Sequence, residues 1–157
     1  MPVGKDEFRT ALSHFGSSVT VVTTNDEHQK PRGLTVSAFS SLSLEPPLVL
    51  ICIEKRASIY QHLKEGGYFA VNILAEDQEI ISRRFASRDP DRFSGVGYSH
   101  GTSGTPLLDG ALAHMECRIT AAHEGGDHTI FIGEVEATST KEGKPLLYFR
   151  GGYSRLA

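Results

Sequence analysis

Alternating apolar and polar positions recur along the sequence and predict a mainly β protein. The clearest case is 111–121, whose side chains follow the two-residue period of a strand with one buried and one wet face. The expected buried set is Ala113, Met115, Cys117 and Ile119, and the expected wet set is His114, Glu116, Arg118 and Thr120. Runs of β-branched and apolar residues predict further strands at 18–24, 48–53, 68–74, 129–140 and 146–153.

One of these strands and one further stretch, 34–41, have patterns that say more about their surroundings. The run at 48–53 is apolar on both faces, which is typical of a central strand. The stretch 34–41 begins by alternating apolar and hydroxyl-bearing side chains, so we expect its hydroxyls on the face opposite the core. The apolar positions are Leu34, Val36 and Ala38, and the hydroxyl positions are Thr35 and Ser37.

Helical spacing predicts three short helices beside the strands. Residues 6–15 place Phe8, Ala11, Leu12 and Phe15 on one stripe. A serine near the start of 57–67 and a glycine pair at its end indicate a short capped helix. Residues 76–87 have acids first and arginines last, the order that the helix dipole favours. The remaining segments are polar turns at 25–33, 124–128 and 141–145, and a long irregular surface loop at 88–110.

The predicted elements add up to about seven strands with short flanking α-helices in one domain, 1–157. The final third consists of antiparallel hairpins. A closed or nearly closed barrel buries such a sheet without leaving free edges, so a barrel is the expected architecture.

Composition narrows the function classes. The chain of 157 residues has a formal net charge of −3, which disfavours nucleic acid as a partner. No apolar stretch approaches the roughly 20 residues of a membrane span, and the first residues lack the apolar core of a signal peptide, so we expect a cytoplasmic protein. Cys52 and Cys117 lie far apart in apolar runs and are expected to be buried hydrophobes.

Several common catalytic patterns are absent. The sequence has no G-x-G-x-x-G after a strand, no P-loop and no nucleophile elbow. Its seven histidines never form H-x-x-x-H or H-E-x-x-H, so we expect no sequence-local metal site.

One segment, 35–58, gathers the groups that bind an anionic ligand. Hydroxyls, a lysine and an expected helix start can supply hydrogen-bond donors without a broad positive field. The groups are Thr35, Ser37, Ser40, Ser41, Lys55 and Ser58. A serine-rich strand end on a plain surface is the alternative.

Five blocks of sequence resemble one known family. They are "FRTALSHFGSSVTVVTT", "GLTVSAFSSLSLEPPLVLICIEKRAS", "FAVNIL", "GDHTIFIGEV" and "PLLYFRGGY", which occur in this order between residues 8 and 153. In order and spacing they resemble the flavin reductase component of two-component flavin-dependent monooxygenases. The resemblance implies a split β-barrel with Greek-key connections and about six to seven strands, usually a homodimer. It also implies reduction of FMN or FAD by NADH or NADPH and delivery of reduced flavin to a separate monooxygenase.

The resemblance further implies which residues meet the cofactors. Three groups of residues would hold the flavin: a first wall, a second wall that ends in a phosphate donor, and a helix end near the flavin tail. They are Thr35, Val36, Ser37, Ser40 and Ser41; Cys52, Ile53, Glu54, Lys55 and Ser58; and Arg83, Phe85, Ala86 and Ser87. Because an acid beside phosphate would repel it, we expect the Glu54 side chain to point away. The alternative role of Arg83 is to complement the helix dipole.

His128 is the best functional candidate of the chain. In the resembled family, the histidine of the "GDHT" block faces the nicotinamide or flavin site, whereas read alone it is an ordinary loop residue. Its expected role is positioning, since the cofactor carries the hydride chemistry itself. Arg150 and Tyr153 are expected to close the nicotinamide end, and Arg88, Arg92 or Arg150 could meet a 2′-phosphate.

Three functions stay open at this point. The first is an NAD(P)H:flavin oxidoreductase that supplies a partner monooxygenase. The second is a flavoprotein that keeps its flavin and reduces another acceptor, such as a corrinoid. The third is a flavin-binding protein without turnover.

Overall fold

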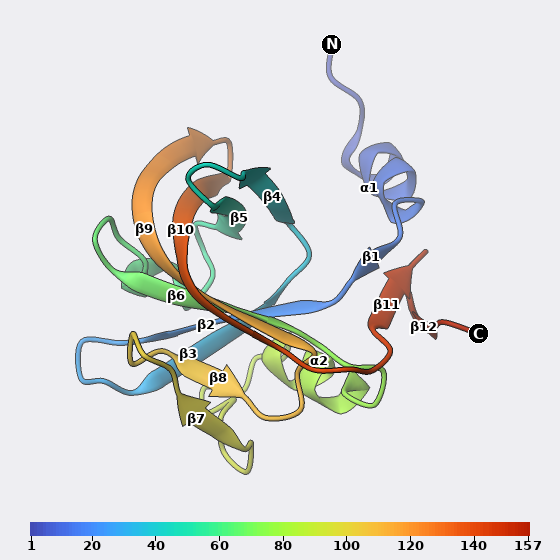
Figure 1. The fold of residues 1–157 in the computed structure, drawn as a ribbon. Coiled ribbons are helices and arrows are strands. Elements are labelled where there is room, and N and C mark those ends of the chain that lie inside the picture. Colours follow the sequence, from blue (N-terminus) through green and yellow to red (C-terminus); the bar gives the residue numbers. More distant parts are fainter.

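The computed structural model describes residues 1–157, and it confirms a mainly β protein (Figure 1). The strands form three antiparallel sheets, of which the largest has the order β3-β2-β6-β9-β10-β5-β4. Its strands are β2 (Thr20–Asn25), β3 (Pro31–Val36), β4 (Phe39–Ser43), β5 (Leu48–Glu54), β6 (Tyr68–Ile73), β9 (Ala113–Gly125) and β10 (His128–Thr140). The edge strands β3 and β4 are not paired with each other, so the ladder is open between them.

Two small sheets and three helical elements complete the chain. The first sheet has the order β1-β11-β12, and the second pairs β7 with β8. The elements are α1 (Lys5–Ser13), β1 (Ser17–Ser18), the 3₁₀ turn η1 (Tyr60–His62), α2 (Glu79–Phe85), β7 (Tyr98–His100), β8 (Pro106–Leu108), β11 (Leu146–Phe149) and β12 (Gly152–Arg155). None of the helices has the length and apolar character that crossing a bilayer requires.

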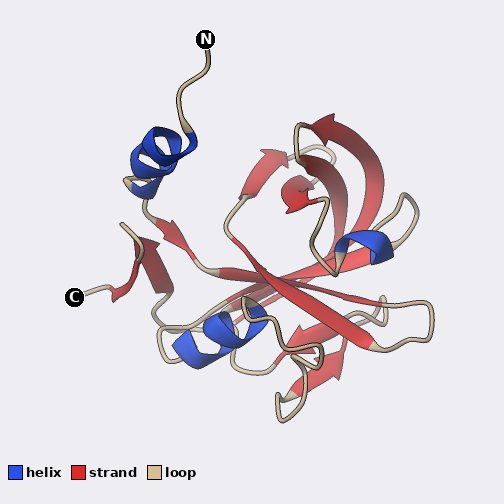
Figure 2. Cartoon of the chain, turned by 180° about the vertical axis from the view of Figure 1, so that it is seen from behind, coloured by secondary structure: helices blue, strands red, loops and turns tan.

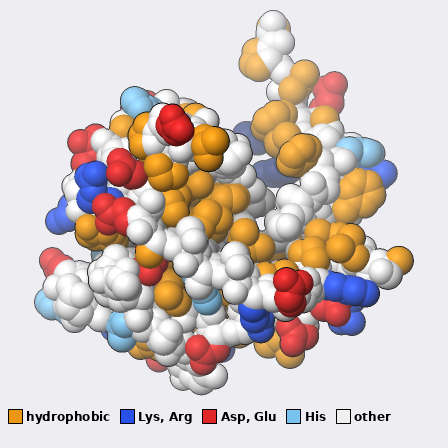
Figure 3. Space-filling model, in the orientation of Figure 1, with side chains coloured by type: hydrophobic (Ala, Val, Ile, Leu, Met, Phe, Trp, Pro, Cys, Tyr) orange, Lys and Arg blue, Asp and Glu red, His pale blue; other side chains and the backbone are white.

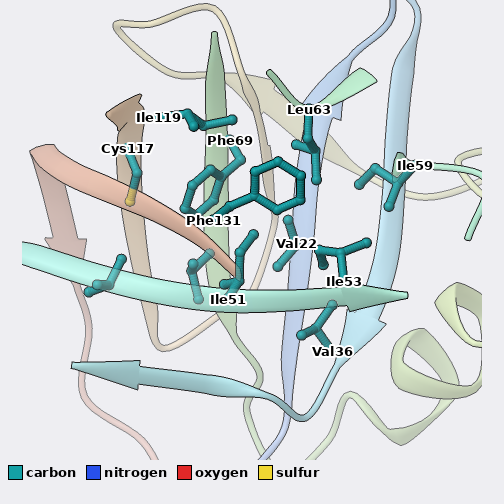
Figure 4. Close-up of a cluster of buried hydrophobic side chains, with 12 residues drawn as sticks. Val22, Val36, Ile51, Ile53, Ile59, Leu63, Phe69, Cys117, Ile119 and Phe131 are labelled. Atoms are coloured by element: carbon teal, nitrogen blue, oxygen red, sulfur yellow. The ribbon is translucent and has the colours of Figure 1, made fainter. Parts of the chain in front are cut away.

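The main core lies inside the curved sheet. Twelve buried side chains, from β2, β3, β5, β6, β9, β10 and the segment around η1, pack together there. Figure 4 shows the rings of Phe69 and Phe131 surrounded by aliphatic side chains. Val22 belongs to this cluster, whereas its neighbour Val21 belongs to a second one, so β2 is buried on both faces.

The second core joins α2 and the β7–β8 hairpin to the sheet. Figures 1 and 2 show both elements on the same side of the crossing strands. Phe85 of α2 is completely buried and packs edge-to-face on Phe93, with ring centroids 4.9 Å apart. The helical spacing predicted for 76–87 is confirmed, since Ile81 also packs on this cluster.

The single strand expected at 146–153 is instead a hairpin of β11 and β12 with a turn at Arg150 and Gly151. Two further segments, predicted as a helix and as a loop, also differ from the structure. The helix expected at 57–67 is only the single turn η1, because Gly66 and Gly67 instead exchange backbone hydrogen bonds with Ile119 of β9. The expected irregular loop at 88–110 contains the β7–β8 hairpin and the buried side chains of Phe93 and Leu108. In both segments, contacts with distant strands decide the local structure.

In β9 and β5 the burial of side chains also differs from the pattern that the sequence predicted. Glu116, expected on the wet face of β9, is 5% exposed. Its carboxylate accepts hydrogen bonds from the backbone N–H and hydroxyl of Ser103, at 2.8 and 2.6 Å, and it thereby fixes the loop between β7 and β8. β5 has a partner on each side, as a central strand should, but of its residues only Val49, Ile51 and Ile53 are buried.

The continuous stretch expected at 34–41 belongs to two different strands, β3 and β4. β3 starts at Pro31, within the expected turn, and ends at Val36, and β4 starts at Phe39. Val36 is buried as expected, but Ala38 is exposed because the chain turns there from one edge of the sheet to the other.

The turn between β2 and β3 is built around one buried carboxylate. Asp26 accepts backbone hydrogen bonds from His28 and Lys30, both at 2.9 Å, and contacts Arg32 Nη2 at 2.9 Å. These donors lower the pKa of Asp26 to about 2, with the backbone N–H of Lys30 as the largest cause. The hairpin therefore places the start of β3 rigidly.

Helix α1 stands off the rest of the chain (Figure 1). It forms as predicted, but its apolar stripe has no partner within the chain: Phe8 and Leu12 are each 55% exposed and Phe15 is 80% exposed. The space-filling view shows hydrophobic side chains at the surface of this projecting arm (Figure 3).

Candidate functional site

A groove of about 840 Å³ runs along the free edge of β3. It is lined by residues 30–38, 52, 54, 56–58, 88–93 and 128, which come from β3, β5, the segment before η1, the segment after α2, and the start of β10. This volume lies in the usual range of about 300–1,000 Å³ for small-molecule sites.

The wall formed by β3 offers backbone groups to a ligand. β3 pairs only with β2, so the backbone N–H and C=O groups on its other side are not used by a neighbouring strand. The exception is the carbonyl of Gly33, which accepts a hydrogen bond from Arg92 Nη1 at 2.8 Å. A planar ring with donors and acceptors on its edge can pair with such a strand.

The groove has a surplus of positive charge although the chain is acidic overall. Three carboxylates face five cations, which are Lys30, Arg32, Arg56, Arg88 and Arg92. Of these cations, Lys30, Arg56 and Arg88 form no salt bridge and no side-chain hydrogen bond within the chain, whereas Arg32 pairs with Asp26. Three unpaired cations around one groove favour an anionic ligand.

Nine of the residues named from the sequence as ligand-binding candidates line this groove together. They are Thr35, Val36, Ser37, Cys52, Glu54, Ser58, Arg88, Arg92 and His128. The Thr35 hydroxyl donates to the carbonyl of Ser82 at 2.7 Å and so ties β3 to α2, whereas the Ser37 side chain is exposed and free. Burial raises the pKa of the Cys52 thiol, so this side chain is expected to stay uncharged.

Three named residues near β4 and β5 lie outside the groove. Ser40 and Ser41 are exposed on the edge strand β4. Ile53 is buried in the main core.

Lys55 also lies outside the groove, and its ammonium group pairs with Glu124. The hydrogen bond from Lys55 to Glu124 is the largest cause of the raised pKa of Lys55. Its neighbour Arg56, which the sequence did not single out, takes the position of a cation in the groove.

The residues named on α2 and near the C-terminus form a separate contact. Arg83 is exposed, pairs with Glu79 at 3.0 Å and lies over the ring of Tyr153, 4.8 Å from its centroid. The Tyr153 hydroxyl hydrogen-bonds Ser82 Oγ at 2.7 Å. Arg150 occupies the tight turn between β11 and β12 with φ 52°. Within one chain this contact docks the β11–β12 hairpin on α2.

The other residues named at the end of α2 support the segment that follows. Phe85 is core and Ala86 is the exposed C-cap of α2. The carbonyl of Ser87 accepts two hydrogen bonds from Arg92, at 3.0 and 2.6 Å.

Arg92 therefore holds the segment 88–93 against β3, and its removal should loosen the groove. We expect Arg92→Leu to lower the free energy of unfolding by about 2 kcal/mol, since the part-buried carbonyls of Gly33 and Ser87 lose a charged donor. It should also weaken ligand affinity several-fold. Urea denaturation and ligand titration measure the two effects. Arg88→Leu is the matched control: it lacks protein partners, so an equal loss of stability in that variant would contradict the assignment.

An edge strand, free hydroxyls and unpaired cations around one groove are the features that a site for a planar, anionic nucleotide requires. The chain belongs to the flavin reductase-like domain family, whose model matches residues 12–157. It is 43% identical over 150 residues to the reductase subunit HsaB of a flavin-dependent monooxygenase from Rhodococcus jostii, covering 95% of this chain and 76% of that protein.

Two further proteins support this membership. The chain is 40% identical over 150 residues to the FMN reductase (NADH) SmoA of Agrobacterium fabrum, covering 96% of this chain and 85% of that protein. Its structure is similar to that of the NADH:FAD oxidoreductase SgcE6 of Streptomyces globisporus, solved with NAD and FAD fragments, with a TM-score of 0.92 and 42% identity. This match covers 98% of this chain and 93% of the other. The resemblance seen in the sequence is confirmed.

Proposed function

We propose that this chain is an NADH-dependent flavin reductase that transfers a hydride to FMN or FAD and supplies the reduced flavin to a partner monooxygenase. The observation that carries the proposal is the groove along β3, in a chain whose homologues are NADH-dependent flavin reductases. The flavin, when bound, supplies the ring that accepts the hydride.

The role of the chain's own residues is to bind the flavin and to orient it toward NADH. The free backbone edge of β3 fits the ring edge, and Ser37 and Ser58 offer hydroxyls from two sides of the groove. Arg56 and Arg88 can neutralise phosphate because no carboxylate of the chain pairs with them. Placing two flat rings in contact saves the entropy of their encounter, so no nucleophile and no acid–base pair is required.

The remaining named residues keep their roles as predictions. Within one chain none of them lines the groove. Four of them lie on or next to β4 and β5, and six lie on α2, directly after α2 or in the β11–β12 hairpin. The predicted binding residues in question are Ser40, Ser41, Ile53, Lys55, Arg83, Phe85, Ala86, Ser87, Arg150 and Tyr153.

Catalysis can be tested with the purified chain in two steps. Flavin absorbance is followed after rapid anaerobic mixing with NADH, first with one equivalent of flavin and then with a large excess. We expect fast bleaching and reduction of the whole excess. Bleaching of one equivalent only would favour a flavoprotein with another acceptor, such as a corrinoid, and no bleaching would leave a binding protein.

We further propose that two copies of the chain form a homodimer through α1 and the β11–β12 hairpin. α1 meets this hairpin through a hydrogen bond from Arg150 N to the carbonyl of Ser13, at 2.9 Å, and through an edge contact between His14 and Phe149. The two elements and the residues that directly follow them expose large apolar side chains, namely Phe8, Leu12, Phe15, Tyr148, Phe149 and Leu156. A second copy that covers these side chains would account for their exposure.

A charge in this apolar surface should break the dimer. We expect the variant Phe8→Asp with Leu12→Asp to be monomeric at concentrations where the wild type is dimeric, because a buried unpaired carboxylate costs more than the apolar contact it replaces. Light scattering after size exclusion gives the mass. Ile80→Asp, which changes an exposed apolar residue of α2, should stay dimeric. A monomeric wild type would contradict the proposal.

Two finer points follow from the same proposal. A cytoplasmic location fits a reductase that depends on NADH. We also propose that the curved sheet is a split β-barrel. In support, β3 and β4 are the two edges of this sheet, Ser37 and Ala38 connect them, and the backbone N–H of Cys52 donates to the Ala38 carbonyl at 3.0 Å.

A further inference from the structure

Ser82 places a hydroxyl in the interior of the protein, on the buried side of α2. It is completely buried, and the only other buried residue of this helix is Phe85. Alanine favours a helix more strongly than serine does, and it would bury no polar atom at this position. A buried hydroxyl needs a hydrogen-bond partner, and here the partner is the hydroxyl of Tyr153 in β12, at 2.7 Å.

A second contact of Ser82 reaches the wall of the groove. The backbone carbonyl of Ser82 accepts a hydrogen bond from the Thr35 hydroxyl at 2.7 Å, and Thr35 lines the groove from β3. β3 also lies directly on the end of α2, since a Cβ added at Gly33 would be 2.7 Å from the Phe85 ring. Because packed interiors have no spare room, a shift of α2 must move this wall or leave a gap behind it.

The docking of β12 on α2 depends on Tyr153. β12 pairs only with β11, and Tyr153 is the one residue of β12 whose side chain hydrogen-bonds another element. Its ring also lies under the guanidinium of Arg83, at 4.8 Å, and edge-to-face on Tyr148, with ring centroids 5.2 Å apart. The pair of hydroxyls is therefore the specific link between the β11–β12 hairpin and the buried side of α2.

We propose that Ser82 is a positioning residue through which the docking of the β11–β12 hairpin sets the flavin affinity of the groove. Its hydroxyl joins α2 to Tyr153 and its carbonyl joins α2 to Thr35, so both contacts meet at one buried residue. The assignment rests on the flavin-binding part of the proposed function, because it names a residue outside the groove that governs this binding. Coupling is reciprocal, so bound flavin also tightens the docked hairpin.

A double-mutant cycle on the two hydroxyls tests the coupling. Ser82→Ala, Tyr153→Phe and the double variant are titrated with FMN and with FAD, and binding is followed by flavin fluorescence. Each single change removes the same hydrogen bond, so each should raise the flavin dissociation constant about fivefold. The double variant should bind no more weakly than either single variant. If the Tyr153 hydroxyl touched the flavin itself, its removal would weaken binding further in the Ser82→Ala background.

Ser103→Ala is the matched control for Ser82→Ala. It makes the same substitution and removes a hydroxyl that donates to Glu116 at 2.6 Å, in a loop that does not line the groove. Urea denaturation should show a loss of stability in both serine variants, whereas flavin affinity should fall in Ser82→Ala alone. Unchanged affinity in Ser82→Ala, an additive loss in the double variant, or an equal loss of affinity in Ser103→Ala would overturn the assignment.

The position of β3 is measured separately, in protein without flavin. The backbone amide NMR signals of Thr35 and Val36 should shift in Tyr153→Phe, although Tyr153 has no hydrogen bond to β3, and they should stay in place in Ser103→Ala. Unshifted signals in Tyr153→Phe would also contradict the assignment. A wild type that binds no flavin would overturn the proposed function, whereas these signals would still report whether Ser82 positions β3.

Discussion

Ser37→Tyr is expected to abolish flavin binding while the fold stays intact. Ser37 lies between β3 and β4, is exposed, and lines the groove, so a tyrosine ring there occupies the space of the ligand. It should displace no core side chain, because the Ser37 side chain is exposed at the surface of the groove. We expect the flavin dissociation constant to rise about a hundredfold or more, which corresponds to about 3 kcal/mol.

Quenching of flavin fluorescence on titration measures this affinity, and urea denaturation measures the fold. Ser99→Tyr is the matched control, since Ser99 is an exposed strand serine outside the groove. It should bind flavin as the wild type does. A well-folded Ser37→Tyr variant with unchanged affinity would show that flavin binds elsewhere on the chain.

The spacing of apolar residues correctly predicted the elements in which burial follows the period of a strand or a helix. β2, β6, β10 and α2 lie where β-branched runs or helical spacing placed them. Segment 57–67 could not be predicted in this way, since Gly66 and Gly67 are hydrogen-bonded to Ile119, more than fifty positions away. Glu116 is a second case: its alternation fits a wet face, but Ser103 supplies the donors that allow a carboxylate to be buried.

The lining of the groove was also predictable only in part, because contacts between segments that are distant in the sequence decide where some of its side chains lie. The stretch from Thr35 to Ser37 and the histidine of "GDHT" were found from hydroxyl patterning and family resemblance. Arg56 was missed in favour of Lys55, because the direction of a side chain after the end of a strand does not follow the strand's alternation. Lys55 is turned outward by Glu124, whose position beside it depends on the pairing of β5 with β10 and of β10 with β9.

The fold itself is most sensitive at Gly133 of β10. A Cβ added there would lie 2.7 Å from the Phe69 ring and 2.8 Å from Cys117 Cβ, which is closer than real side chains approach. Gly133 is buried, and the register of β10 against β9 shifts beside it. We expect Gly133→Val to lower the free energy of unfolding by about 3 kcal/mol through overpacking. At this chain length, such a loss lowers the Tm by about 10 °C.

Calorimetry and urea denaturation measure the loss, and a compensating change identifies its cause. Phe69→Leu removes the ring atoms that a side chain at Gly133 would strike, so the double variant should be more stable than the sum of the two single losses predicts. Gly125→Ala, whose added Cβ meets its nearest neighbours at an ordinary 3.6 Å, should cost little. If Gly133→Val were as stable as the wild type, or if its loss simply added to that of Phe69→Leu, the close packing of β10 on β6 would not be what requires a glycine here.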